Sequence, residues 1–312
     1  MSRFAHLATL EKNQTPALWP RKTMSDQKSS GTAHPYLNQP IVLTTKHEKY
    51  SLIAPILEAA LGLKVVLHEA DTDQLGTFTG EIERTLSPSD AAIEKAKLGM
   101  TALGYKLAIA SEGSIGPDPQ MPFTQSDIEY VALVDSDRGI EIVERFRSFE
   151  IIADEIVTDP SSDLSDFLRS VDFPNHKLIA QPNGARGEYV VKGIKDQHQL
   201  QRALEDLAVK SPDGKVLLQT DFRAHCSPSR QQNIIEATKL LAKRVRELCP
   251  SCSTPGFGVT RFERGLDCSD CGELVSTAVK FEVSGCPKCS FEEAGQQLAD
   301  FANPSNCDGC NP

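Results

Sequence analysis

The sequence lacks any long apolar run, which excludes a protein anchored by membrane-spanning helices. No stretch of its 312 residues approaches the ~18 consecutive apolar residues that such a helix needs. The first residues also lack the apolar segment of a secretory signal. We therefore expect a cytoplasmic protein with no membrane partner.

Positive charge is also scarce. The formal net charge is −10 at pH 7, and an acidic protein is repelled by phosphate backbones. One group of basic residues, at positions 239–246, fits the solvated face of a helix. The composition therefore disfavours nucleic acid as a partner, and it is otherwise that of an ordinary globular protein, with 39% hydrophobic and 24% charged residues.

Three regions follow from the pattern along the chain. Residues 1–39 are rich in polar residues and proline without hydrophobic periodicity, and we expect a disordered tail there. Met24 is an alternative start to Met1, and a transit peptide is an alternative interpretation of this tail. We assign residues 40–247 to an α/β domain and residues 248–312 to a small zinc-binding domain of the ribbon type.

The α/β assignment comes from strands that alternate with helices. β-branched and apolar runs predict strands at 41–45, 64–68, 107–110, 130–134, 140–149, 177–180, 188–194 and 215–220. Helical periodicity and capping residues predict helices at 53–61, 87–103, 163–171, 197–209 and 227–248. This alternation predicts a mostly parallel or mixed sheet flanked by helices.

Cysteine is almost confined to the last region. Eight of the nine cysteines form four Cys-x-x-Cys pairs there: Cys249 and Cys252, Cys268 and Cys271, Cys286 and Cys289, Cys307 and Cys310. In a reducing compartment this spacing indicates metal rather than disulfides. We predict two structural zinc ions, each held by four thiolates, with an iron–sulfur cluster or redox pairs as the alternative.

Two ways of pairing the four motifs remain open. Sequential pairing would give two ribbons in series, and interleaved pairing would join the first motif to the third and the second to the fourth. We favour sequential pairing because a short hairpin over 257–263 fits between the first two motifs. The region has four basic and nine acidic side chains, so we expect it to dock a protein rather than a nucleic acid.

Polar clusters follow the first predicted strands, where α/β proteins place ligands. Thr45, Lys46, His47 and Lys49 lead into a helix, and this arrangement suits a phosphate. Glu81 and Glu83 could hold Mg²⁺, and Arg84 beside them could bind a phosphate. A solvated turn and a charged loop are the structural alternatives for these two clusters.

Two further clusters complete the candidate site. Glu112 ends the predicted strand at 107–110 and precedes a glycine, so it could be a metal ligand, a general base or a helix cap. Arg223, His225 and Arg230 surround the start of the last long helix, which would attract an anion. Cys226, the one cysteine outside the pairs, is a poor candidate nucleophile because sequence neighbours on a strand point apart.

The run from Ile41 to Gly116 resembles the inosine/xanthosine triphosphatase-like nucleotide pyrophosphatases. The resemblance is carried by Thr44 to His47, Thr77-Phe78 with Glu81 and Glu83, Lys95-Ala96, and Ser111-Glu112-Gly113. From Ile41 onward, the chain also resembles an uncharacterised bacterial family that joins such an α/β half to a Cys-Pro-x-Cys tail. The first resemblance implies an inosine triphosphatase-like fold and a nucleotide or other phosphorylated small molecule as ligand.

The leading hypothesis is a Mg²⁺-dependent hydrolase that cleaves non-standard nucleoside triphosphates and releases pyrophosphate. In it, Glu81, Glu83 and Glu112 hold metal and position water, while the basic residues hold phosphates. The alternative is a non-catalytic protein that binds a nucleotide or another anion and docks a protein through its zinc module.

Overall fold

The structure is a computed structural model that describes residues 33–46, 48–70, 85–184, 187 and 189–312. His34–Pro312 forms one compact unit. The disordered tail predicted for residues 1–39 falls almost entirely outside the described residues. No helix in the described part of the chain is long and apolar enough to cross a membrane.

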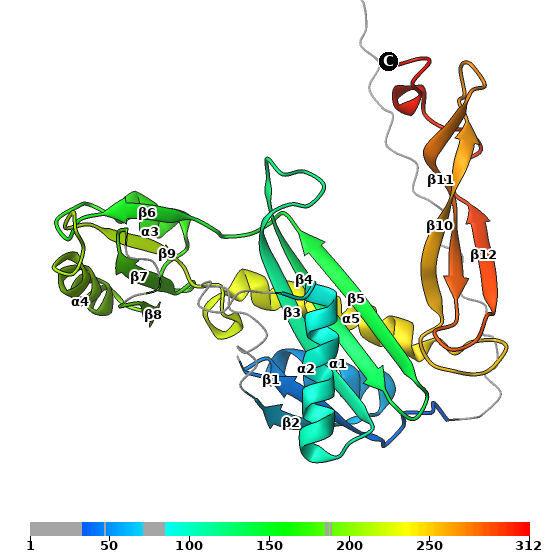
Figure 1. The fold of residues 1–312 in the computed structure, drawn as a ribbon, viewed down its shortest axis with the longest axis horizontal. Helices are drawn as coiled ribbons and strands as arrows, with labels where there is room; N and C mark the ends of the chain where they lie inside the picture. Colours follow the sequence, from blue (N-terminus) through cyan, green and yellow to red (C-terminus); the bar gives the residue numbers. More distant parts are fainter. Residues whose placement is uncertain (1–32, 47, 71–84, 185–186, 188) are drawn as a thin grey trace, which may run out of the picture. The chain divides into compact units, whose positions relative to one another are not determined.

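A five-stranded mixed sheet forms the first half of the unit, as predicted (Figure 1). Its order is β2-β1-β3-β4-β5, with bounds β1 Pro40–Thr45, β2 Lys64–Glu69, β3 Leu107–Pro117, β4 Gln125–Asp135 and β5 Ile140–Ser148. β1 pairs in parallel with β2 and β3, whereas β4 pairs antiparallel with β3 and β5. The parallel strands therefore share one carboxyl edge, which is where ligands of such sheets bind.

Helices cover both faces of this sheet. Helices α1 (Tyr50–Leu61) and α5 (Pro228–Arg246) share a buried core with Leu107 and Ile109 of β3. Helix α2 (Pro88–Leu103) packs on the opposite face, over the small side chains of Ala108 and Ala110. Successive side chains of a strand point to opposite faces. In β3 and β4, every second residue therefore faces α1 and α5, and the residues between them face α2.

Local signals account for the ends of α2. The Ser87 hydroxyl accepts a hydrogen bond from the Asp90 amide at 3.1 Å, and Pro88 occupies the first turn. Gly104 ends the helix in the left-handed conformation, with φ +72°. Both ends agree with the boundaries predicted from the sequence.

A second sheet, which the sequence analysis did not separate from the first, follows β5. It has four antiparallel strands in the order β6-β9-β7-β8, with bounds β6 Glu155–Thr158, β7 Leu178–Pro182, β8 Val191–Ile194 and β9 Val216–Thr220. Its helices α3 (Ser165–Ser170) and α4 (Gln197–Ala208) bury their own apolar cluster against it. The predicted strands are present, but they pair with one another rather than extending the first sheet.

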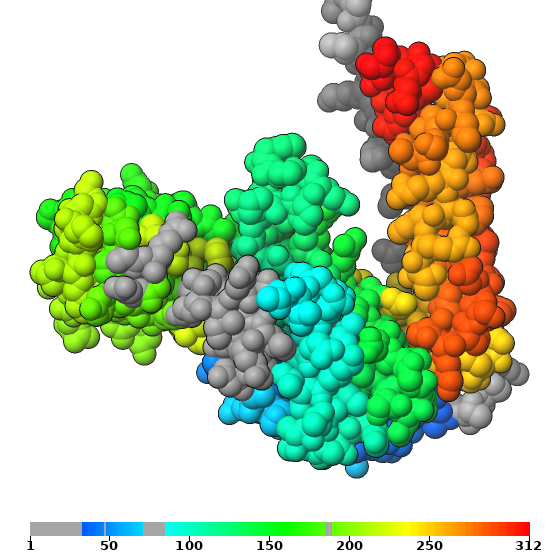
Figure 2. Space-filling view, in the orientation of Figure 1, coloured from blue at the N-terminus to red at the C-terminus, as the bar shows by residue number. Residues whose placement is uncertain are grey.

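The cysteine-rich module, residues 249–312, is a three-stranded antiparallel sheet. Its strands β10 (Gly258–Asp267), β11 (Leu274–Gly285) and β12 (Glu292–Gln297) lie side by side in that order (Figure 1). All six residues of β12 are exposed, and the strand lies at the surface in Figure 2. Glu292 and Glu293 begin this strand, and charge on an edge strand opposes pairing with other chains.

Candidate functional site

The eight paired cysteines form two separate four-sulfur groups. One contains Cys249, Cys252, Cys286 and Cys289, and the other contains Cys268, Cys271, Cys307 and Cys310. Within each group the ligand atoms all lie within 4.8 Å of one another. Zinc–sulfur bonds of ~2.3 Å in a tetrahedron place two sulfurs about 3.8 Å apart. Sulfurs of different motifs are 3.8 and 3.6 Å apart in the first group and 3.8 and 3.5 Å apart in the second.

These distances fit one zinc ion in each group and exclude disulfides, in which the sulfurs are ~2.05 Å apart. The predicted zinc ligands are therefore brought together. The pairing is interleaved, however, and the sequential pairing that we favoured is wrong. The predicted hairpin over 257–263 is also wrong, because β10 runs without a turn from Gly258 to Asp267.

The long β10–β11 hairpin causes the interleaving. Its register places Gly258 opposite Gly285 and Asp267 opposite Leu274. The first and third motifs therefore flank one end of the hairpin, and the second motif lies in the turn at the other end. β10 has 10 residues, so at about 3.3 Å per residue it holds the first and second motifs roughly 30 Å apart.

Further polar residues gather near the carboxyl edge of the parallel strands, on the sheet face under α1 and α5. We call Lys49, Ser111, Asp127, Glu129 and Arg230 the α5-side cluster. The Lys49 ammonium donates a 2.9 Å hydrogen bond to the Ser111 hydroxyl. Arg230 is 2% exposed and forms an ion pair with Glu129, which is fully buried. Burial and the nearby Arg230 guanidinium lower the pKa of Lys49 to about 8.

Gly113 makes room for this ion pair. A Cβ atom at this position would lie 2.4 Å from Nη2 of Arg230 and 2.6 Å from Oε1 of Glu129. A larger residue would therefore displace one of the two charged groups. Asp127, two residues before Glu129 on the same face of β4, accepts a 2.7 Å hydrogen bond from the Asn233 amide.

The opposite face carries the α2-side cluster, which consists of Thr44, Lys95 and Glu112. Lys95 of α2 pairs with the Glu112 carboxylate, and the two side chains are 12% and 6% exposed. Thr44 packs against Gly99, where a Cβ would lie 2.0 Å from the Thr44 hydroxyl oxygen. Glu112 and Lys95 both contribute to the pKa of Lys49, so the two clusters interact electrostatically through the sheet.

Glu112 does not end a strand as predicted. β3 continues to Pro117, and Glu112 lies opposite Tyr130 in its middle. The strand is longer because β4 pairs with it over 11 residues from Leu107 to Pro117, which the β3 sequence alone does not reveal. The Glu112 side chain still belongs to the α2-side cluster, because it lies on the same face of β3 as Ala108 and Ala110.

The other predicted phosphate ligands fall into three groups. Thr45 ends β1 with a buried side chain, and Lys46 follows it with an exposed one. Arg223 is held by Asp221, with 2.6 Å between Nη2 and Oδ2, while burial and Arg223 lower the pKa of His225. His47, Glu81, Glu83 and Arg84 lie outside the described residues.

Sequence reasoning missed Asp127 and Glu129. They alternate with Val131 and Leu133 on one face of β4, the face that packs on α5. Acidic residues in the core-facing positions of a predicted strand are a signal, because burial of unpaired carboxylates is unfavourable. Lys95 was indicated only by the family resemblance, and Ser111 only as a neighbour of Glu112 and by that resemblance.

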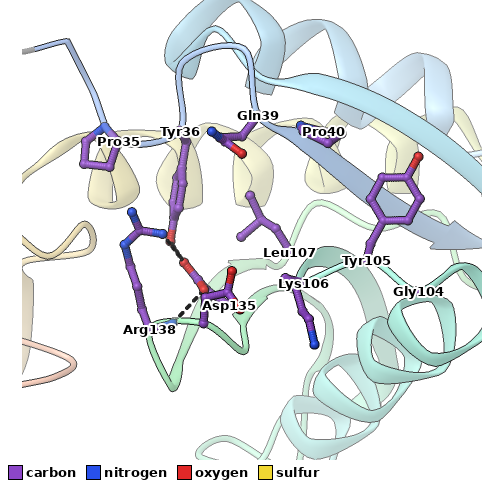
Figure 3. A pocket seen from close by; sticks show the side chains of 11 residues that line it. Pro35, Tyr36, Gln39, Pro40, Gly104, Tyr105, Lys106, Leu107, Asp135 and Arg138 are labelled. Atoms are coloured by element: carbon purple, nitrogen blue, oxygen red, sulfur yellow. Dashed lines mark hydrogen bonds and ion pairs between the residues drawn. The ribbon is translucent and has the colours of Figure 1, made fainter.

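A pocket of about 430 Å³ lies at the opposite end of the parallel strands, where β1 and β3 begin (Figure 3). The Tyr36 hydroxyl donates a 2.8 Å hydrogen bond to Asp135, and Arg138 donates one of the same length to the same carboxylate. The Arg138 guanidinium also lies 5.0 Å from the Tyr36 ring centre. These groups satisfy one another, which fits a structural contact that holds the segment before β1.

Fold and sites together define a mixed α/β protein with two four-cysteine groups at its C-terminal end. The chain belongs to the family DUF6671, described as a domain of unknown function, whose model matches residues 95–312. This confirms the predicted membership of an uncharacterised family. No curated protein matches the chain.

Among solved structures, a nucleoside-triphosphatase (dITP/XTP pyrophosphatase) from Mycobacterium abscessus is similar to part of the chain. The similarity has a TM-score of 0.26 and 16% sequence identity, and it covers 35% of this chain and 70% of that one. A likeness of this size carries no conclusion about activity.

Proposed function

We propose that the protein hydrolyses nucleoside triphosphates, with preference for non-standard nucleotides, to a monophosphate and pyrophosphate in the presence of Mg²⁺. The observation that carries the proposal is that Lys49, Lys95 and Arg230 lie near the carboxyl edge of β1, on the two faces of the sheet, and interact electrostatically. Two buried hydroxyl oxygens, those of Thr44 and Thr45, have no hydrogen-bond partner in the described part of the chain. Cationic side chains with hydroxyl donors are suited to phosphate groups.

The sequence motifs support the same ligand, because Thr44 to His47 and Lys95 belong to the pyrophosphatase-like pattern. In the proposed reaction, the basic residues bind and orient the triphosphate. Glu112 orients a water molecule and takes its proton as the water oxygen attacks the α-phosphorus. The bond from this phosphorus to the bridging oxygen breaks, and pyrophosphate leaves. Bound magnesium would neutralise charge on the phosphate oxygens.

The proposal is tested with a panel of nucleoside triphosphates, assayed for pyrophosphate and phosphate release with and without Mg²⁺. Glu112→Gln should lower turnover by about 10²–10⁴-fold, the range for loss of a general base. Glu141→Gln on β5 is the matched control, because Glu141 is a half-exposed carboxylate in an ion pair with Lys97. Full activity of Glu112→Gln would remove Glu112 from the mechanism.

The alternative function, binding without turnover, predicts a different result from the same protein. Calorimetry would then show a nucleotide bound at the two clusters, with Lys49→Met weakening it, and no triphosphate would be cleaved. We likewise propose that each four-cysteine group holds one structural zinc ion, since its sulfur geometry supports that assignment.

A further inference from the structure

Asp127 and Glu129 each have one buried carboxylate oxygen that no group in the described part of the chain satisfies. Both side chains are fully buried. Oδ1 of Asp127 and Oε2 of Glu129 have no hydrogen-bond partner among the described residues. Buried polar atoms nearly always have a partner in folded proteins, so two orphaned carboxylate oxygens on one strand require an explanation.

The two carboxyl groups are neighbours. They lie two residues apart on one face of β4, where the charge of Glu129 acts on Asp127. Burial, followed by the charge of Glu129, raises the pKa of Asp127 to about 7. The protein therefore holds two acidic groups so close that ionisation of one opposes ionisation of the other.

Glu129 and Asp127 differ in the cationic side chains that contact them. Glu129 has Arg230 as a direct ion-pair partner and also lowers the energy of the charged Lys49. Among the described residues, the direct partner of Asp127 is the neutral amide of Asn233, at 2.7 Å. The second carboxylate therefore lacks a cation in contact with it among the described residues.

From these observations we infer that Asp127 and Glu129 bind a divalent cation through their orphaned oxygens. Mg²⁺ and Mn²⁺ use one or two protein carboxylates and take the remaining ligands from water and phosphate oxygens. The inference rests on the proposed function for the role of this cation, which would meet the phosphates held by Lys49 and Arg230. The inferred metal ligands therefore lie on β4, whereas the sequence had indicated Glu81, Glu83 and Glu112 as metal ligands.

The test measures Mn²⁺ binding to the full-length, zinc-loaded protein without nucleotide, by the loss of the electron paramagnetic resonance signal of free Mn²⁺. We expect one Mn²⁺ per chain at pH 8 and at least a tenfold weaker affinity in Asp127→Asn. Asparagine keeps the shape of the side chain, and its carbonyl oxygen can still accept the Asn233 bond. Thermal unfolding checks that the variant is folded.

Asp135→Asn is the matched control, because Asp135 is also a buried carboxylate of β4 but is satisfied by Tyr36 and Arg138. It should bind Mn²⁺ as the wild type does. Absence of Mn²⁺ binding in the wild type, or unchanged binding in Asp127→Asn, would overturn the inference. Mn²⁺ binding that depends on Asp127, together with no turnover of any triphosphate, would refute the proposed function and leave the metal site standing.

Discussion

Interleaved pairing of the cysteine motifs can be tested by counting zinc in double variants. Cys249→Ser with Cys286→Ser removes two ligands of one group, so the other group should keep its metal and the protein should hold one zinc per chain. Cys249→Ser with Cys268→Ser removes one ligand from each group, so both ions should bind more weakly than in the wild type. Sequential pairing predicts the reverse, because Cys249 and Cys268 would then share one ion.

The magnitudes favour a clear result. Zinc binding to small structural sites is worth about 10–16 kcal/mol at pH 7, so a group with two missing ligands should not retain its ion through purification. Chain entropy slightly favours sequential pairing. Closing the 34-position loop from Cys252 to Cys286 costs only about 0.6 kcal/mol more than closing a loop of half that length. The rigid β10–β11 hairpin outweighs this difference.

Mass spectrometry of the native protein and elemental analysis would give the zinc content. Cys226→Ser is the matched control and should keep both ions, since Cys226 lies outside both groups. One tightly held zinc in the Cys249/Cys268 double variant, and only weakly held zinc in the Cys249/Cys286 double variant, would refute the reasoning from the hairpin register.

Three other substitutions probe the polar clusters. Arg230→Met should lower the free energy of unfolding by about 3–5 kcal/mol in denaturant titrations, because it leaves the buried Glu129 charge without its partner. Gly99→Ala should cost about 1–3 kcal/mol despite the better helix propensity of alanine, because its Cβ would overlap Thr44. Lys49 is protonated up to pH 10.5 when unfolded but only to about pH 8 when folded, so deprotonation favours the folded state. Wild-type stability should therefore rise from pH 8 to 10.5 relative to Lys49→Met, by up to about 3 kcal/mol.

Each of these three predictions has a control measurement on the same protein. Arg169→Met breaks an ion pair whose side chains are 77% and 96% exposed, and it should cost under about 1 kcal/mol. Equal losses for the Arg169 and Arg230 variants would contradict the role of burial. Thr101→Ala on the exposed side of α2 should be nearly neutral, and a Gly99→Ala protein more stable than wild type would show that Thr44 does not crowd that site. A parallel pH dependence in wild type and Lys49→Met would argue against a perturbed Lys49.

Local structure was predictable because its signals are local. The cap at Ser87, the left-handed Gly104 and the β-branched run of β1 each act within a few residues, and the structure agrees with all three. The length of β3 was not predictable in the same way. Glu112 and Gly113 carry no strand signal of their own, and they are extended because β4 pairs with them.

In the candidate site, too, local features were predictable from the sequence and long-range contacts were not. The sequence indicated Lys49 and Arg230, since each lies beside the start of a helix. It did not indicate that Arg230 would meet Glu129, 101 positions away, because that contact depends on how α5 packs on β4. The motif spacing likewise identified every member of the two four-cysteine groups but not their pairing, which the hairpin of two long strands determines.

The interleaved pairing also determines when each four-thiol group becomes complete during synthesis of the chain. In sequential order, the first group of four thiols would be complete when the ribosome reaches Cys271. With the observed grouping, the first is complete only at Cys289 and the second only at Cys310. Four thiols of the nascent chain therefore wait without a full set of partners while 18 further residues are made. During that interval no complete four-thiol group can protect them from oxidation by binding metal, so their protection requires reducing conditions.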